Sequence, residues 1–199
     1  MGVEARRGHK RGGGDPLTET SSSSALRRVE SREEVDAAVT LAWEYGQWMV
    51  QVAKREYGID AEAESEQGLG SSIDQLLAPR GRLYLVEVDG VPVGLGGLKP
   101  VSDEIAEIKR IYLRPSARGH GLGRQLLDQL LTDARELGVK LVRLESAAFM
   151  PEARSLYRSV GFKEVPAFSG EFAAIPGAQE IQVFMALCLD NAEETPDTA

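Results

Sequence analysis

The stretch Arg118-Gly119-His120-Gly121-Leu122-Gly123 decides the fold of this chain, because it joins a strand pattern to a helix pattern. Residues 105–113 before it mix apolar and charged side chains, and Pro115 ends that run. After it, leucines recur at helical spacing through residue 137. We therefore predict a loop that leads from a strand directly into an amphipathic helix.

This loop has the features of a phosphate-binding site. The first N–H groups of a helix lack intrahelical partners and carry the positive end of the helix dipole, so phosphate groups bind there. Gly119, Gly121 and Gly123 allow the backbone to approach a ligand with no Cβ in the way. Arg118 and Arg124 add cations that oppose the dipole, which favours an anion at this position. A glycine-rich loop that only caps a helix is the alternative.

Two other phosphate-binding motifs fit poorly. A P-loop requires Gly-Lys-Ser/Thr, whereas Gly123 is followed by Arg124-Gln125 and no hydroxyl is available for magnesium. A Rossmann fingerprint requires its third glycine at position 124, and its βαβ unit stands at the start of a domain. Neither motif explains a glycine-rich loop in the middle of the chain.

The patterns on both sides of the loop predict an α/β fold with a mixed sheet and helices on its faces. The predicted order is β-α-α-β-β-β-α-β-α-β-β. Strand patterns cover residues 25–30, 82–88, 91–98, 105–113, 140–145, 162–165 and 181–189, and helix patterns cover 32–57, 72–77, 121–137 and 151–160. Ser31 and Glu34 form a capping-box pattern, and Trp43 is expected on the buried stripe of the first helix.

The composition indicates one domain with a core of its own. The chain has 199 residues, of which 42% are hydrophobic, so we expect a domain over residues 25–190 between flexible tails at 1–24 and 191–199. The net charge of -8 argues against nucleic-acid binding. The sequence has no stretch apolar enough for a membrane span, so a cytoplasmic protein is expected. Its one cysteine, Cys188, lies in an apolar run and is expected to be buried.

Two separated motifs resemble those of the GNAT superfamily of N-acyltransferases. The family signature is Arg or Gln, two residues, Gly, one residue, then Gly or Ala, which Arg118, Gly121 and Gly123 match. Residues 152–162 resemble the family's Ala-x-x-Leu-Tyr-x-x-x-Gly-Phe helix. The resemblance covers about residues 82–165 and implies a mixed, mostly antiparallel sheet flanked by helices.

The resemblance implies an acetyl-CoA-dependent N-acetyltransferase, in which an amine attacks the thioester directly and no metal takes part. It implies that the loop holds the pyrophosphate and that the preceding strand pairs with the pantetheine arm, with a backbone N–H near Leu113 facing the thioester oxygen. The implied cofactor-binding residues are Ile111, Tyr112, Leu113, Arg118, Gly119, His120, Gly121, Leu122, Gly123 and Arg124. Many relatives place an Asn at Met150, so the contact of that Asn with pantetheine is missing or replaced here.

The resemblance also implies two catalytic residues. Tyr157 stands at the position of the general acid that protonates the CoA thiolate. Glu107 matches the position at which some relatives have a base, and Glu145 on the next strand is a second candidate. Either glutamate is alternatively a solvated or ion-paired strand residue, and Tyr157 is alternatively a packed aromatic residue.

The acceptor is expected to be the amine of a small molecule. In this fold, residues 43–78 and 166–180 surround the acceptor, and Asp60, Glu62, Glu64 and Glu66 in the first segment favour a cationic amine. A protein N-terminus or lysine is the alternative acceptor, and a module that binds acetyl-CoA without turnover is the alternative function. The sequence also leaves open a homodimer through the last strands.

Overall fold

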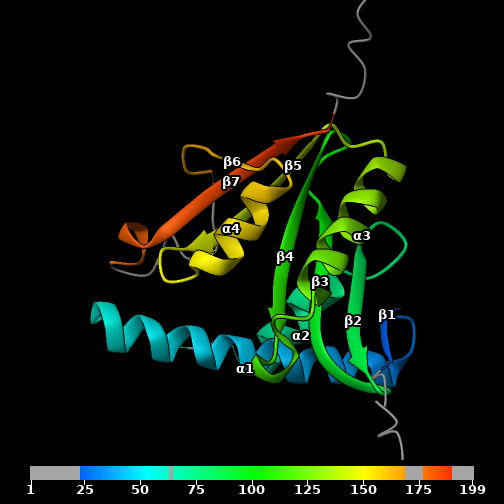
Figure 1. The fold of residues 1–199 in the computed structure, drawn as a ribbon, viewed down its shortest axis with the longest axis horizontal. Helices are drawn as coiled ribbons and strands as arrows, with labels where there is room; N and C mark the ends of the chain where they lie inside the picture. The colour runs from blue at the N-terminus through cyan, green and yellow to red at the C-terminus, as the bar shows by residue number, and fades with distance from the viewer. Residues whose placement is uncertain (1–22, 63–64, 169–176, 190–199) are drawn as a thin grey trace, which may run out of the picture.

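A computed structural model of the chain describes residues 23–62, 65–168 and 177–189. The described residues form one seven-stranded sheet in the order β1-β2-β3-β4-β5-β7-β6, with helices on both faces (Figure 1). All neighbouring pairs are antiparallel except β4 and β5, which are parallel. The predicted mixed α/β fold is confirmed. The predicted tails lie outside the described residues, apart from Ser23 and Ser24, and Ser24 begins β1.

The elements follow the predicted order, with differences at their ends. They are β1 (Ser24–Arg28), α1 (Arg32–Tyr57), α2 (Glu66–Asp74), β2 (Arg82–Val88), β3 (Val91–Pro100), β4 (Ile105–Leu113), α3 (Leu122–Glu136), β5 (Leu141–Ala147), α4 (Pro151–Ser159), β6 (Lys163–Glu164) and β7 (Gln182–Cys188). The largest difference is in α2, which begins well before the predicted residue 72. The hydroxyl of Ser65 accepts a hydrogen bond from the N–H of Gly68 and caps this earlier start.

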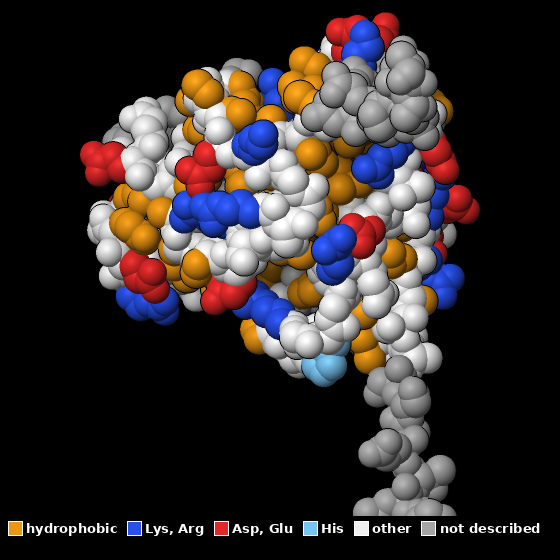
Figure 2. All heavy atoms as spheres, turned by 45° about the horizontal axis from the view of Figure 1, so that its top comes forward, with side chains coloured by type: hydrophobic (Ala, Val, Ile, Leu, Met, Phe, Trp, Pro, Cys, Tyr) orange, Lys and Arg blue, Asp and Glu red, His pale blue; other side chains and the backbone are white. Residues whose placement is uncertain are grey.

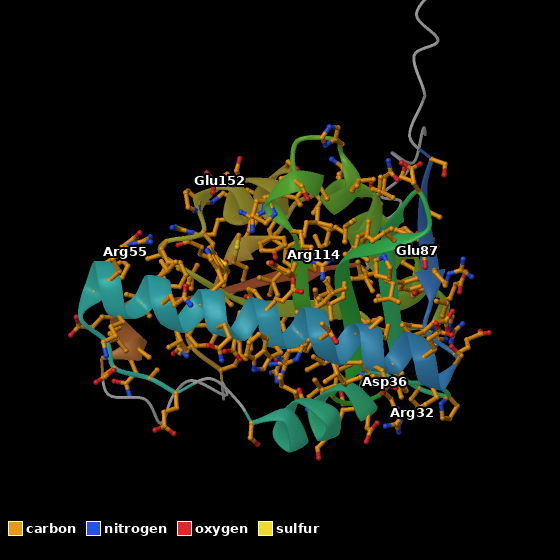
Figure 3. All side chains as sticks on the ribbon, turned by 90° about the horizontal axis from the view of Figure 1, so that it is seen from below. Arg32, Asp36, Arg55, Glu87, Arg114 and Glu152 are labelled. Atoms are coloured by element: carbon orange, nitrogen blue, oxygen red, sulfur yellow. The ribbon has the colours of Figure 1, made fainter. Side chains whose placement is uncertain are left out.

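The sheet has a separate core on each face. Alternate residues of each strand point to opposite faces, so Tyr84 and Val86 pack with α3 and α4, whereas Leu83 and Leu85 pack with α1 and α2. Figure 1 shows α3 and α4 in front of the sheet and α1 across its lower end. Viewed from below in Figure 3, α3 and α4 lie on one side of the strands and α2 on the other. The sheet is therefore the middle of three layers.

Helix α1 has well-defined ends. The Ser31 hydroxyl accepts from the Glu34 N–H at 3.2 Å, and the Glu34 carboxylate accepts from the Ser31 N–H at 2.9 Å, so the predicted capping box is confirmed. Gly58 ends the helix with a φ of 67°. The predicted stripe is wrong at Trp43, which is 49% exposed, and Leu41 is buried instead.

Two findings concern the outer surface of the molecule. Cys188 is exposed, so its predicted burial is wrong. Odd-numbered residues of β7 pack against the α3 and α4 core, whereas Cys188 is even-numbered and ends the strand.

None of the helices in the described ranges combines the length and the apolar character that a membrane crossing requires.

Glycine is required in β3 where this strand approaches β4. A Cβ built on Gly94 lies 2.5 Å from the carbonyl oxygen of Tyr112 and closer still to a methyl group of Leu113. A backbone atom cannot move away easily, so we expect Gly94→Ala to lower the free energy of unfolding by about 1–3 kcal/mol.

Gly70→Ala is the matched control, measured with Gly94→Ala by thermal and urea denaturation. Gly70 lies in α2, and a Cβ built on it has nothing within 4 Å, so alanine there stabilises by up to about 1 kcal/mol. Equal stability of the two variants would show that the close approach of β3 and β4 is not a constraint.

Candidate functional site

The two central strands separate at one end of the sheet. Parallel pairing between β4 and β5 covers only Ile105 to Ile108 on β4 and Leu141 to Leu144 on β5. Both strands continue past the last pair, β4 to Leu113 and β5 to Ala147. Beyond that pair, each strand has an edge with no partner strand among the described residues. An extended ligand can therefore pair with β4 as another strand would.

A bulge lies in β4 at the point where the strands separate. Leu95 pairs with Tyr112 and Gly97 pairs with Lys109, so Gly96 faces two residues of β4, Arg110 and Ile111. Arg110 has a φ of 59°, a strained value for a residue with a side chain, and its guanidinium donates to the Ser72 hydroxyl at 2.7 Å.

The bulge reverses which face each β4 side chain takes. Before it, Ala106 and Ile108 face α3 and α4; after it, Ile111 and Leu113 face that side. Tyr112 packs in the core on the α1 and α2 side, with its ring 5.5 Å from that of Tyr45. Because of the bulge, Ile111 and Leu113 face α3 and α4 while Tyr112 faces α1 and α2; these are the three residues predicted to contact pantetheine.

The predicted phosphate loop has unpartnered donors. Among the described residues, the N–H groups of residues 119–123 donate to no other group, whereas the N–H groups of Arg124 and Gln125 bond back to Gly121. Gly119 and Gly121 have φ values of 82° and 77°, and nothing lies within 4 Å of a Cβ at either position. Gly121 begins α3 without a side-chain cap. An open cradle of N–H groups at a helix start fits a pyrophosphate. His120 is exposed in this cradle.

Three arginines surround the loop, and each has a partner within the protein. Arg114 forms a bidentate ion pair with Glu44 of α1 at 2.6 and 2.8 Å, which lowers the pKa of that carboxyl. Arg118 donates to the Leu113 carbonyl at 3.0 Å and lies 5.7 Å from the centre of the Trp48 ring. Figure 3 shows Arg114 beside the middle of α1.

Arg124 pairs with Asp128 at 2.8 Å, one helical turn along α3, and both side chains are about half exposed. An exposed pair of this kind contributes little to stability and can rearrange around an incoming anion. On the face shown in Figure 2, basic and acidic side chains alternate in small groups, and no broad basic surface is visible.

A pocket lies on the α1 side of the sheet, near the point where β4 and β5 separate. Tyr45, Met49, Val50 and Ala53 of α1 form one wall, and Glu145 and Ala147 at the end of β5 form another with Gln182 of β7. The pocket draws on both segments expected around the acceptor, since Ala178 also lines it. Residues 169–176 of the second segment lie outside the described residues.

Two tyrosines, the buried Tyr157 and the half-buried Tyr45, lie on opposite faces of the sheet near the point where β4 and β5 separate. Tyr157 of α4 belongs to the α3 and α4 core and is 5% exposed, while Tyr45 lines the pocket on the α1 side. Burial raises the pKa of Tyr45 to about 12, and Arg110 lowers it while Glu145 raises it further. Burial also raises the pKa of Tyr157, and the nearby Tyr45 adds to that increase. Both hydroxyls therefore stay protonated at neutral pH.

The two candidate bases occupy different surroundings. Glu107 lies in the paired part of β4, where its carboxylate is 2.7 Å from the Lys109 ammonium and 3.1 Å from the Arg143 guanidinium. Glu145 lines the pocket, and its carboxylate is 3.9 Å from Lys109. Neither Glu107 nor Tyr157 lines the pocket.

Sequence reasoning missed Tyr45 and Gln182. Tyr45 falls at helical spacing with Ala38, Leu41 and Ala42, all of which are buried, so the stripe itself was the available signal. Gln182 had no such signal, because its place in the pocket depends on the pairing of β7 with β5.

Comparison with known proteins agrees with this geometry. YjgM of Escherichia coli, an uncharacterized N-acetyltransferase, is 31% identical over 123 residues, which are 59% of this chain and 74% of the relative. The ribosomal protein bS18-alanine N-acetyltransferase of Haemophilus influenzae is 33% identical over 107 residues, 54% of this chain and 71% of that protein. The structure of the acetyltransferase YncA of Salmonella typhimurium with acetyl-CoA matches with a TM-score of 0.58 at 18% identity, over 88% of this chain and 99% of that one.

The family assignment rests on a match that includes the divergent strands, the loop and α4. Residues 39–162 match the model of the acetyltransferase (GNAT) family, and this range is more than half of the chain. The chain therefore belongs to the acetyltransferase (GNAT) family and is an acyltransferase.

Proposed function

We propose that the chain transfers the acetyl group of acetyl-CoA directly to the primary amine of a small molecule. The observation that carries this proposal is the row of unpartnered N–H groups at residues 119–123, next to the edge of β4 that has no partner strand among the described residues. Acetyl-CoA supplies an acetyl group activated as a thioester. The protein then has to hold that group, orient the amine and move two protons.

The loop and β4 bind different parts of the cofactor. The N–H groups of residues 119–123 bind the pyrophosphate. The side chains of Arg118 and Arg124 leave the Leu113 carbonyl and Asp128, their present partners, and pair with the negative charges of the phosphates. The backbone of Ile111, Tyr112 and Leu113 pairs with the amides of the pantetheine arm. A backbone N–H beside the bulge faces the thioester oxygen and stabilises the negative charge that develops on it.

Glu145 is the group best placed to take the proton of the amine. It lines the pocket on the acceptor side, and its side chain is 9% exposed. Glu107 is already paired with the Lys109 ammonium and the Arg143 guanidinium, and it does not line the pocket. We therefore assign Glu145 to proton removal, directly or through a water, and Glu107 to the structure of the β4 and β5 pair.

Tyr157 is the group placed to protonate the thiolate. Its raised pKa keeps the proton available but makes complete transfer to a thiolate more uphill than for an exposed tyrosine. We infer that the Tyr157 hydroxyl first donates a hydrogen bond to the sulfur as charge develops. Proton transfer then follows late in the step.

The relatives also support a second acceptor. One of them acts, by its name, on the alanine of ribosomal protein bS18, so a polypeptide N-terminus remains the alternative to a small amine. Calorimetry with acetyl-CoA, followed by thiol release with polyamines, amino acids, alkylamines and short peptides, tests the function and separates the acceptors. Binding without release from any acceptor supports a module that only binds acetyl-CoA, and absence of binding contradicts the proposal.

Gly121→Glu tests the phosphate loop. The new carboxylate would stand at the helix start and repel the pyrophosphate, so we expect the acetyl-CoA Kd to rise by about 100-fold, close to 3 kcal/mol. Gly138→Glu is the matched control, because Gly138 has a similar φ of 73° and open space around its Cβ but lies at the far end of α3. Equal affinities of the two variants, measured by calorimetry, would place the cofactor elsewhere.

Tyr157→Phe tests the proton donor. Loss of the hydroxyl removes proton donation, so we expect kcat to fall by about 10²–10⁴ with an unchanged Kd for acetyl-CoA. Tyr84→Phe controls for the loss of a buried hydroxyl, since Tyr84 lies in the same core and its oxygen accepts from Gln129 at 3.5 Å. A Tyr157→Phe enzyme with full kcat would remove this residue from the mechanism.

Glu145→Gln and Glu107→Gln together identify the base. We expect Glu145→Gln to lower kcat/KM by about 10²–10⁴ at pH 7, and the deficit should shrink toward pH 9 as solvent deprotonates more of an amine with a pKa near 10. Glu107→Gln should instead lower the Tm, because Lys109 and Arg143 lose a buried partner. The reverse pattern would make Glu107 the base.

A further inference from the structure

The pocket beside Glu145 has an apolar wall. Residues from α1, from the segment after it, from the β5–α4 connection and from the position just before β7 line this wall: Met49, Val50, Ala53, Ile59, Phe149 and Ile181. Ala53, Ile59 and Ile181 also form a small buried cluster, against which Phe149 packs. Most of the surface that a bound molecule would meet is therefore hydrocarbon, which favours an occupant with an apolar group.

The size of the pocket limits that group. The cavity volume is about 70 Å³, on the scale on which one water occupies roughly 10–15 Å³. Roughly five to seven non-hydrogen atoms therefore fit inside. A short alkyl chain or one ring meets this limit, whereas an amino sugar or a long polyamine exceeds it.

The charges around the pocket limit the occupant to one positive group. Glu145 is the carboxylate among the described residues of the lining, and its neighbour Lys109 already lies 3.9 Å away. Asp60, from the acidic segment after α1, instead pairs with Lys54 at 2.9 Å and is 82% exposed. A second ammonium in this pocket would be desolvated without a partner, which is strongly unfavourable. Asp60 therefore does not bring a second carboxylate to the pocket.

We propose that the acceptor is a primary amine joined to one compact apolar group, with the amine at Glu145 and the apolar group among Met49, Ala53 and Ile181. This inference rests on the proposed N-acetyltransferase function and narrows its substrate class. The pocket selects such amines by excluding polyamines and amino sugars, whose additional charges find no second carboxylate among the described residues that line it.

Pentylamine and 1,4-diaminobutane provide the first test, because they differ only by a methyl group in place of a second ammonium. With saturating acetyl-CoA and the wild-type protein, we expect kcat/KM for pentylamine to exceed that for the diamine by at least about tenfold. Calorimetric titration of each amine into the protein with CoA present should show the same order of affinity, and this readout does not depend on turnover.

Ala53→Leu provides the second test. The larger side chain fills the apolar end of the pocket, so we expect kcat/KM for pentylamine to fall at least about tenfold while the Kd of acetyl-CoA stays unchanged. Gln51→Leu is the matched control, because residue 51 is exposed on the same turn of α1 and does not line the pocket. If Ala53→Leu fails to fold, the comparison of the two amines with the wild type still decides the question.

The outcomes separate this inference from the proposed function. Turnover of 1,4-diaminobutane or spermidine equal to that of pentylamine overturns the inference but leaves the N-acetyltransferase in place. A short peptide acetylated at its N-terminus at least about tenfold faster than pentylamine also overturns it, in favour of a polypeptide acceptor. Failure to bind acetyl-CoA contradicts the proposed function, and the amine titration then reports on the pocket alone.

Discussion

The site depends on the loss of pairing between β4 and β5 after Ile108 and Leu144. Parallel strands that stayed paired would close the sheet between its two cores, and no group on the α4 side would reach one on the α1 side. Where they separate, Tyr45 on the α1 side is near enough to Tyr157 on the α4 side to add to the rise in the pKa of Tyr157. The same separation gives β4 a free edge directly before the glycine-rich loop. The proposed cofactor strand, proton donor and acceptor pocket therefore share one structural cause.

The bulge at Arg110 accompanies this separation and is stabilised from outside the strand. A left-handed backbone conformation is unfavourable for arginine, but the bond to Ser72 of α2 and the glycines of β3 favour it. Gly94 and Gly96 allow β3 to lie against the bulged segment, where a Cβ would meet Leu113 or Leu126. The result is that Tyr112 turns to Tyr45 while Ile111 and Leu113 stay on the α3 and α4 side.

Charged residues on the α1 face of β4 and β5 form a short connected series. Arg143, Glu107 and Lys109 lie within ion-pair distance of one another in turn, and Glu145 ends the series at the pocket. The members inside the paired region form ion pairs with each other, whereas the last member borders the pocket. The different roles that we propose for the two glutamates follow from these surroundings.

The sequence by itself determined the order of elements, the capping of α1 by Ser31 and Glu34, the helix start at Gly121 and the family motifs around Arg118 and Tyr157. These features depend on neighbours within a few residues, so periodicity, capping residues and turn glycines are enough to predict them. The tertiary structure alone decided which glutamate borders the pocket, that Tyr45 lines this pocket, and that Asp60 pairs with Lys54 instead of lining it. The first two depend on side chains tens of residues apart, and their meeting follows from strand register and helix packing, which local sequence patterns do not specify.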